Sequence, residues 1–232
     1  MKSRHEHLQE LNKLRRRHYH PLQHEIHHTH KISRKTLFYI KEYGAQSHTV
    51  KTIMKESIGI LLLASFISLS GGLALEQIKP ILLSIIPLIV LLPALNGMIG
   101  SFGTVISSRF STMLFEGKVK KDWQKNKELN KLLIQIIIIS IIMALISGII
   151  SLLFSWVFQN YPYSFSNTLK IMFIPIIDTI ILVIILFLVS IYAGLYYFKK
   201  NEDPNNFLIP ITTSIADFGN MIILAFLIIW LF

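Results

Sequence analysis

The chain has 232 residues, of which 52% are hydrophobic and only 16% are charged, and its mean hydropathy is +0.53. Because soluble domains carry about 25% charged residues, this composition predicts a membrane protein. The sequence contains no cysteine, which excludes disulfides, thiolate metal sites and cysteine nucleophiles. The net charge of +10 is concentrated in a few segments, so we assign it to a cytosolic surface and not to a nucleic-acid groove.

Residues 1–52 are expected to form a basic, histidine-rich arm in the cytosol. This segment holds all nine histidines and eleven of the 23 lysine and arginine residues. It would either lie on anionic lipid or act as a solvated arm that sets the topology, and we favour the second interpretation. Its histidines could bind Zn²⁺ or Ni²⁺, but no aspartate or cysteine completes a site, so a polar, pH-sensitive segment is the simpler interpretation. The cluster comprises His18, His20, His24, His27, His28 and His30.

Five apolar runs predict five transmembrane helices, which would make residues 53–232 an all-α membrane domain. About 20 residues suffice to cross the hydrocarbon core. The second run is longer than that, and Pro87 and Pro93 predict a kink within it. The third run is rich in isoleucine and almost featureless, as expected for a helix that faces lipid. The runs are 57–75, 80–108, 132–159, 171–198 and 207–232, and a short turn at 76–79 separates the first two.

The basic residues predict the orientation of these spans. With five spans, the joints on one side of the membrane hold every lysine and arginine except Lys79 and Lys170, and these joints are 1–56, 109–131 and 199–206. Since basic joints stay in the cytosol, the N-terminus is expected inside and the C-terminus outside. An even number of spans would remove this asymmetry. We therefore expect a multi-pass protein of the cell membrane.

A stripe of small and polar residues follows the second run at three- and four-residue steps, which place it on one face of a helix. Small residues let membrane helices approach closely, so the stripe is either a packing face or the wall of a pore. Asn96 favours the pore, because a lone amide near the middle of the bilayer is costly. The stripe comprises Pro93, Gly97, Gly100, Ser101, Thr104 and Ser108.

The last run carries a carboxylate near its middle. Asp217 shares a helix face with Thr213 and Asn220, and Pro210 lies a further turn away. A carboxylate in a spanning segment costs about 2.5–3.5 kcal/mol on insertion scales and therefore marks a functional site. Pro210 also leaves backbone carbonyls short of partners, and these could face an ion.

A second carboxylate, Asp178, follows Pro175 in the fourth run. At 1.5 Å per residue it would lie about 12 Å inside the start of that span. It could be a vestibule carboxylate or a second ion ligand. Alternatively, it could reach the headgroups at the end of the helix, or pair with Lys170 or Lys79.

These residues predict a site for a hard divalent cation. With the expected topology, Asn96 and Asp217 fall at a similar depth. One chain offers few carboxylates, but a two-fold dimer would bring two copies of Asp217 together and neutralise one divalent charge. Carboxylates, carbonyls and retained waters suit Mg²⁺. No GxxxxGK[ST] loop is present, so we expect movement down a gradient or ion exchange and not transport driven by ATP.

Two motifs resemble the MgtE and solute carrier family 41 magnesium transporters. The run Pro-Ala-Leu-Asn-Gly-Met-Ile-Gly-Ser-Phe-Gly-Thr at 93–104, followed by Ser-Ser-Arg-Phe-Ser-Thr at 107–112, is similar to the second membrane helix of that family. Asp-Pro-Asn-Asn at 203–206, followed by Pro210, Thr212-Thr213 and Asp217, is similar to its last helix. The resemblance covers about residues 53–232.

The resemblance implies a five-helix unit that forms a homodimer, with a Mg²⁺ path between the two units. It implies that Asp217 is the ion-binding aspartate and that Asn96 and the stripe line the pore. Bacterial members carry large acidic domains that sense Mg²⁺ in the cytosol. This chain is expected to be a half-size form with a short, basic arm in their place.

Three other functions compete with Mg²⁺ transport. The first is transport of Co²⁺, Zn²⁺ or Ni²⁺ with the histidine-rich arm as a metal sensor. The second is a membrane enzyme such as a lipid-headgroup transferase, which usually needs several acids near the cytosolic interface. The third is a purely structural membrane protein, which leaves Asp217 unexplained. We therefore expect a transporter with Mg²⁺ as cargo, and not an enzyme.

Overall fold

The computed structural model describes residues 6, 21–30, 32, 37, 49–119, 123, 126–200 and 202–232. This part of the chain is all helical, as the sequence predicts, and five of its helices are long and apolar enough to cross a membrane. A short helix precedes them in the arm. The helices are α2 (Pro21–His30), α4 (Thr49–Ser84), α5 (Ile86–Phe115), α6 (Lys127–Gln159), α7 (Phe165–Lys199) and α8 (Pro204–Leu231).

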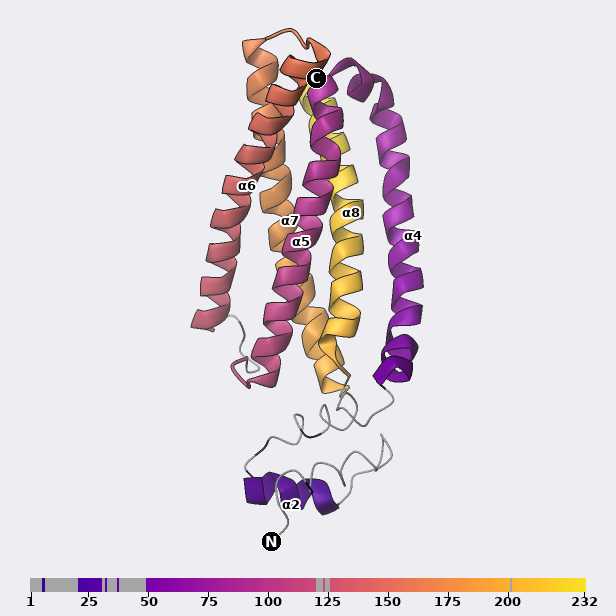
Figure 1. Ribbon diagram of the computed structural model, residues 1–232, viewed down its shortest axis with the longest axis vertical. Coiled ribbons are helices and arrows are strands. Elements are labelled where there is room, and N and C mark those ends of the chain that lie inside the picture. The colour runs from indigo at the N-terminus through magenta and orange to yellow at the C-terminus, as the bar shows by residue number, and fades with distance from the viewer. Residues whose placement is uncertain are drawn as a thin grey trace.

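The five long helices form one bundle with α8 at its centre (Figure 1). α8 packs against α4, α5 and α7, while α6 lies on the outside against α5 and α7. α4 packs almost entirely against α8 and makes few contacts with α5. Since every joint reverses the chain, α4, α6 and α8 run in one direction and α5 and α7 in the other.

The first two spans divide at a different place from the one that the sequence predicts. Residues 76–79 are not a turn, because α4 continues through them and through Pro80 to Ser84. The chain breaks at Ile85, and Pro87, which has no N–H to continue the α4 hydrogen bonds, lies in the first turn of α5. The upper end of α4 bends over toward α5 (Figure 1). The run 80–108 is therefore shared between two helices, and this accounts for its excess length.

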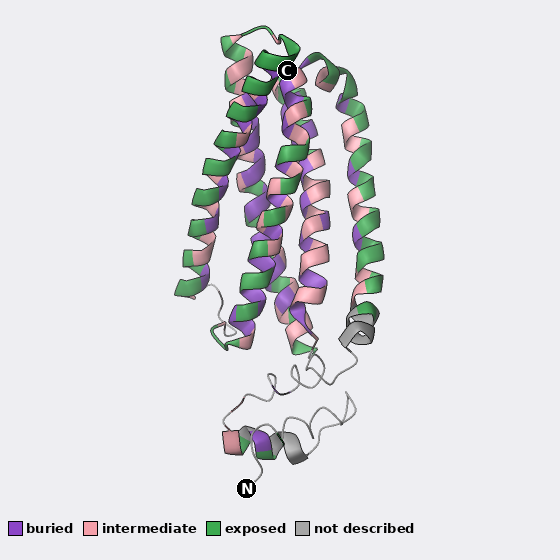
Figure 2. Cartoon of the chain, in the orientation of Figure 1, coloured by how far each residue is buried: buried purple, intermediate pink, exposed green. Residues whose placement is uncertain are grey.

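The outer surface of the bundle is apolar, as a lipid environment requires. Exposed residues cover the outer sides of α4 and α6 (Figure 2), among them Phe66, Leu73, Ile142 and Phe158. By contrast, α7 is the most buried of the spans. The driving force for this arrangement is close packing, because lipid tails are as apolar as the side chains that they touch.

One face of α6 is more specific than the sequence suggests. The prediction that this helix is almost featureless is wrong, because a buried ridge of small residues packs it against its neighbours. Gly148 lies against Met172 and Pro175 on α7, and the Ser151 hydroxyl donates a hydrogen bond to the carbonyl of Pro87. The ridge comprises Ser140, Ala144, Gly148, Ser151 and Ser155.

The joint between α5 and α6 is held by polar contacts. Asn126 caps α6, because its side-chain oxygen accepts hydrogen bonds from the N–H groups of Glu128 and Leu129 at 3.0 and 3.3 Å. Lys118 Nζ lies 2.8 Å from Glu116 and 3.8 Å from Glu128, and its hydrogen bond with Glu116 raises the pKa of the lysine. These exposed ion pairs connect the residues after α5 to the first turn of α6 but add little stability.

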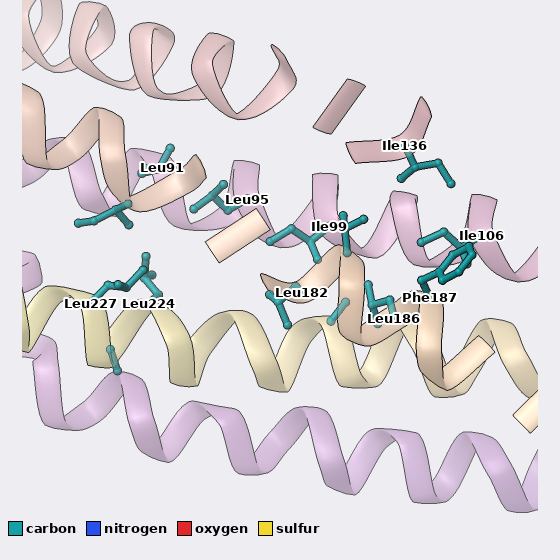
Figure 3. Packing of buried hydrophobic residues seen from close by; sticks show 14 of the residues in the cluster. Leu91, Leu95, Ile99, Ile106, Ile136, Leu182, Leu186, Phe187, Leu224 and Leu227 are labelled. Carbon is teal, nitrogen blue, oxygen red and sulfur yellow. The ribbon is translucent and has the colours of Figure 1, made fainter. Parts of the chain in front are cut away.

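Close contacts bring α5, α7 and α8 together in the core. A Cβ atom at Gly194 would lie 2.6 Å from Phe110 Cε1 and 3.2 Å from Leu208 Cδ1. A Cβ atom at Gly103 would lie 3.2 Å from Thr212 Cβ. Apolar side chains fill the same three-helix contact (Figure 3), including Leu95, Ile99, Leu182, Leu186 and Leu224.

We predict that Gly194→Leu destabilises the bundle, because the new side chain would collide with Phe110. Overpacking of this kind costs about 1–3 kcal/mol. Gly72→Leu is the matched control, since no atom lies within 4 Å of the Cβ position there. Thermal unfolding of the purified protein in detergent measures both. Equal melting temperatures for the two variants would contradict the packing described here.

Candidate cation site

Asp217 lies at the centre of the bundle, where side chains from three helices meet. It is half-buried and occupies the middle of α8. Asn96 Nδ2 on α5 donates a hydrogen bond to Asp217 Oδ1 at 2.8 Å. Ser68 Oγ on α4 donates to Asp217 Oδ2 at 3.1 Å. Each carboxylate oxygen therefore receives one hydrogen bond, and together these fix the orientation of the carboxylate and offset its loss of hydration.

A second amide extends this network. Asn220 is fully buried one turn beyond Asp217, and its Nδ2 donates a hydrogen bond to Asn96 Oδ1 at 3.0 Å. Because the Asn96 oxygen accepts from Asn220, its nitrogen is oriented to donate to Asp217. The sequence-predicted residues Asn96, Asp217 and Asn220 are thus brought together in one chain of hydrogen bonds.

Ser68 is a member of the network that the sequence interpretation missed. The only signal was a serine at mid-depth of the first apolar run. Neighbouring serines give no guidance, because the Ser65 and Ser70 hydroxyls bond to carbonyls of their own helix, those of Leu61 and Ile67. A serine that bonds across helices cannot be distinguished from these by sequence alone.

A groove between α4 and α8 leads along the helices to this network. Its volume is about 460 Å³. Ser68 and Thr213 line it at the level nearest Asp217, and Ser65 and Ser214 add further hydroxyls. Apolar walls complete it, and the full lining is Leu61, Ala64, Ser65, Ser68, Leu69, Pro210, Thr213 and Ser214. A path with hydroxyls on both sides therefore lies beside the carboxylate.

Thr213 and Pro210 both face this groove. The Thr213 hydroxyl donates to the Ile209 carbonyl at 2.9 Å and lies 3.2 Å from the Pro210 carbonyl. Its oxygen keeps its capacity to accept or to coordinate. α8 continues through Pro210 as a helix. Thr213 therefore stands one turn from Asp217 on the same side of α8.

The stripe on α5 does not pack against another helix of the chain along most of its length. Pro93, Gly97, Ser101 and Ser108 are exposed, while Gly100 and Thr104 are half-buried. A Cβ atom at either glycine would meet no atom within 4 Å. The hydroxyls of Ser101 and Thr104 bond to carbonyls one turn back. Packing inside the bundle therefore does not require these small residues.

Asp178 lies further from the start of its helix than the sequence predicts. Because α7 begins at Phe165, the carboxylate lies about 20 Å along the helix, and it is fully buried. It does not pair with Lys170, whose Nζ lies 4.7 Å from the centre of the Phe232 ring. In the described part of the chain, both Asp178 oxygens lack a hydrogen-bond partner.

The histidine cluster forms no metal site in the described residues, where no group of three His, Asp or Glu side chains could hold an ion. His18 and His20 lie outside that part of the chain. His24, His27, His28 and His30 belong to α2. The cluster's predicted role therefore stays a prediction.

The groups around Asp217 are of the kind that hard cations prefer. They are one carboxylate, two amides and nearby hydroxyls, all of them oxygen ligands or donors that orient such ligands. Oxygen ligands suit Mg²⁺ and Ca²⁺, whereas the nitrogen and sulfur ligands that soft metals prefer are missing from this network. A single carboxylate neutralises only half of a divalent charge.

Comparison with known proteins agrees with this chemistry. The sequence model of one family, MgtE, described as a divalent cation transporter, matches residues 92–227, which is more than half of the chain. The match includes Asn96, Asp178 and Asp217. Neither the curated proteins nor the solved structures give a significant match. The chain belongs to the MgtE family of divalent cation transporters and is a multi-pass membrane protein, not an enzyme.

Proposed function

We propose that the protein is a homodimeric channel or transporter for Mg²⁺, with its ion path between the two copies and Asp217 as the central ligand. The observation that carries this proposal is the oriented carboxylate of Asp217 at mid-depth of the bundle. It is held by Ser68 and Asn96, is half-buried and lies beside a groove lined with hydroxyls.

Mg²⁺ is the cargo that this chemistry favours. Mg²⁺ gives up its waters reluctantly and prefers octahedral coordination by oxygens at about 2.0–2.1 Å. A half-open site with one carboxylate and several hydroxyls can bind the ion while it keeps most of its waters. The side-chain oxygen of Thr213 and the carbonyls near Pro210 are the next ligands along α8 toward its N-terminal end.

Charge and packing both support a dimer. One Asp217 carboxylate leaves a divalent ion half neutralised, and a two-fold axis would supply a second. The exposed stripe on α5 is a face of small residues on which another helix could pack closely. In this arrangement Asn96 and the stripe, from Pro93 to Ser108, line the path together with α8.

The charge pattern orients the path. With the N-terminus in the cytosol, as the positive-inside rule predicts, the groove between α4 and α8 lies on the cytosolic side of Asp217. The sequence carries no nucleotide-binding loop, so the ion moves down its electrochemical gradient or in exchange for another ion.

We predict that Asp217→Ala abolishes Mg²⁺ flux into liposomes that contain the purified protein, because the central ligand is lost. Glu76→Gln removes an exposed carboxylate of α4 about two turns beyond Ser68 and serves as the control. A fluorescent Mg²⁺ indicator inside the liposomes measures the flux. Wild-type flux in Asp217→Ala would refute the assignment of this residue.

The dimer proposal predicts that Gly97→Leu reduces both dimer formation and flux while the fold is kept, since no atom of the same chain meets the new side chain. Gly59→Leu is the control, because its Cβ position is equally open but lies on α4. Cross-linking in membranes and the liposome flux report the two effects. A Gly97→Leu protein that dimerises and conducts normally would count against the α5 interface.

The oxygen-only network predicts that Mg²⁺ competes better than Ni²⁺ or Zn²⁺ for the site. Flux of Mg²⁺ is measured with each metal added in turn to the full-length protein. The flux is followed with isotopically labelled Mg²⁺. If Ni²⁺ or Zn²⁺ inhibits this flux more strongly than unlabelled Mg²⁺ does, the result would instead favour the histidine-rich arm as a determinant of selectivity.

A further inference from the structure

Asp178 is a fully buried carboxylate that the path through Asp217 does not use. Its exposed fraction is 0%, and in the described part of the chain neither of its oxygens has a hydrogen-bond partner. The nearest basic residue along α7 is Lys170, two turns away, with its Nζ over the Phe232 ring. A buried carboxylate without a partner is costly in a spanning helix, so the site calls for a positive partner.

The register between α5 and α7 shows what lies beside this carboxylate. The hydroxyls of Ser107 and Ser190 are 3.4 Å apart, and their numbers differ by 83. Because the two helices run in the same direction, the same offset places Asn96 level with Thr179. The turn that carries Asp178 and Thr179 therefore lies at the depth of the amide network.

The contact between α7 and α8 gives the same level independently. A Cβ atom at Gly219 would lie 2.5 Å from Leu182 Cδ2. Asp178 lies one turn before Leu182 on the same face of α7. Because α8 runs antiparallel to α7, moving from Leu182 toward Asp178 corresponds to moving from Gly219 toward Asn220 on α8. Asp178, Thr179 and Asn220 are each 0% exposed, and they lie at one depth in the contact of α5, α7 and α8.

Two more oxygens at this depth lack partners. Within the described residues, Thr179 Oγ1 and Asn220 Oδ1 are buried and receive no hydrogen bond. Other threonines in this protein behave differently, since the hydroxyls of Thr104 and Thr213 bond to carbonyls one turn back. Together with the two oxygens of Asp178, four buried oxygens without partners thus lie at a similar depth of the bundle, and such oxygens are rare in folded proteins.

We propose that Asp178, Thr179 and Asn220 form a second cation site, separate from Asp217, that binds a small monovalent cation. One carboxylate balances a single positive charge, so the occupied site is neutral. The enclosed position disfavours Mg²⁺, because that ion keeps several of its waters. An ion that sheds its waters more readily can use the carboxylate, hydroxyl and amide oxygens directly, and Na⁺ is the probe for it.

The second site is connected to the first by hydrogen bonds. Asn220 presents Oδ1 to the proposed cation, while its Nδ2 donates to Asn96, which in turn donates to Asp217. A cation on Asn220 Oδ1 polarises this amide and strengthens both donations. The Asp217 carboxylate then accepts a stronger hydrogen bond and gains less free energy from binding a divalent ion. This step rests on the proposed function, and it makes binding at the two sites antagonistic.

The direct test is binding of radioactive ²²Na⁺ to the purified full-length protein in detergent, without Mg²⁺ and with choline keeping the ionic strength constant. We expect saturable binding to the wild type, loss of binding in Asp178→Asn, and affinity about tenfold weaker in Thr179→Val. Ser111→Ala is the matched control, because it removes another buried hydroxyl without a partner, outside this site, and should bind as the wild type does.

Wild-type protein that binds no Na⁺ would overturn the proposal and identify Asp178 as a buried neutral carboxylic acid. Undiminished binding in both Asp178→Asn and Thr179→Val would overturn it as well. If Asp178→Asn does not fold, Thr179→Val, which keeps the shape of the side chain, decides the question.

Asp217→Asn separates this proposal from the Mg²⁺ path. The variant should still bind Na⁺ saturably, although more weakly than the wild type because the hydrogen-bonded chain no longer ends on a carboxylate, while its Mg²⁺ flux is lost. In the wild type, saturating Na⁺ should weaken Mg²⁺ binding about fivefold or more. Intact Mg²⁺ flux in Asp217→Asn refutes the proposed function but leaves the Na⁺ measurement valid, whereas loss of Na⁺ binding in this variant refutes a separate second site.

Discussion

The hydrogen-bonded carboxylate of Asp217 is the interaction on which the arrangement of the bundle depends. A charged group at mid-depth in a membrane protein must be hydrogen-bonded or paired, because lipid offers neither water nor counterions. Here the donors come from two other helices, Ser68 on α4 and Asn96 on α5. The central helix α8 is therefore tied to both neighbours at the level where an ion would bind, and a small shift of either neighbour would change the site.

Small residues make this central position possible. Gly103 and Gly194 let α5, α7 and α8 approach closely, and the serine, alanine and glycine ridge of α6 seats that helix against the same core. The remaining glycines of α5, Gly97 and Gly100, have no such task within the chain. The same residue type thus packs one face of α5 and leaves the other open, which is the face that we assign to the second copy.

Much of this could be predicted from the sequence, because the energetic cost of polar groups in lipid restricts where they lie. The lengths of the apolar runs predicted the five spans correctly. The isolated polar residues Asn96, Asp217 and Asn220 are in contact, joined by hydrogen bonds. Ser68 could not be predicted, since a serine in a helix usually satisfies itself on its own backbone. The start of the fourth span was predicted too late, because the polar residues before Ile171 suggested a loop, although α7 begins at Phe165.

In the proposed dimer, two copies of Asp217 share one divalent ion. Calorimetric titration of the purified protein with Mg²⁺, with Asp217→Asn as the comparison, tests it most directly. We expect one tightly bound Mg²⁺ for two chains and no such binding in the variant. One tight Mg²⁺ for every chain, or tight binding that survives in Asp217→Asn, would contradict it.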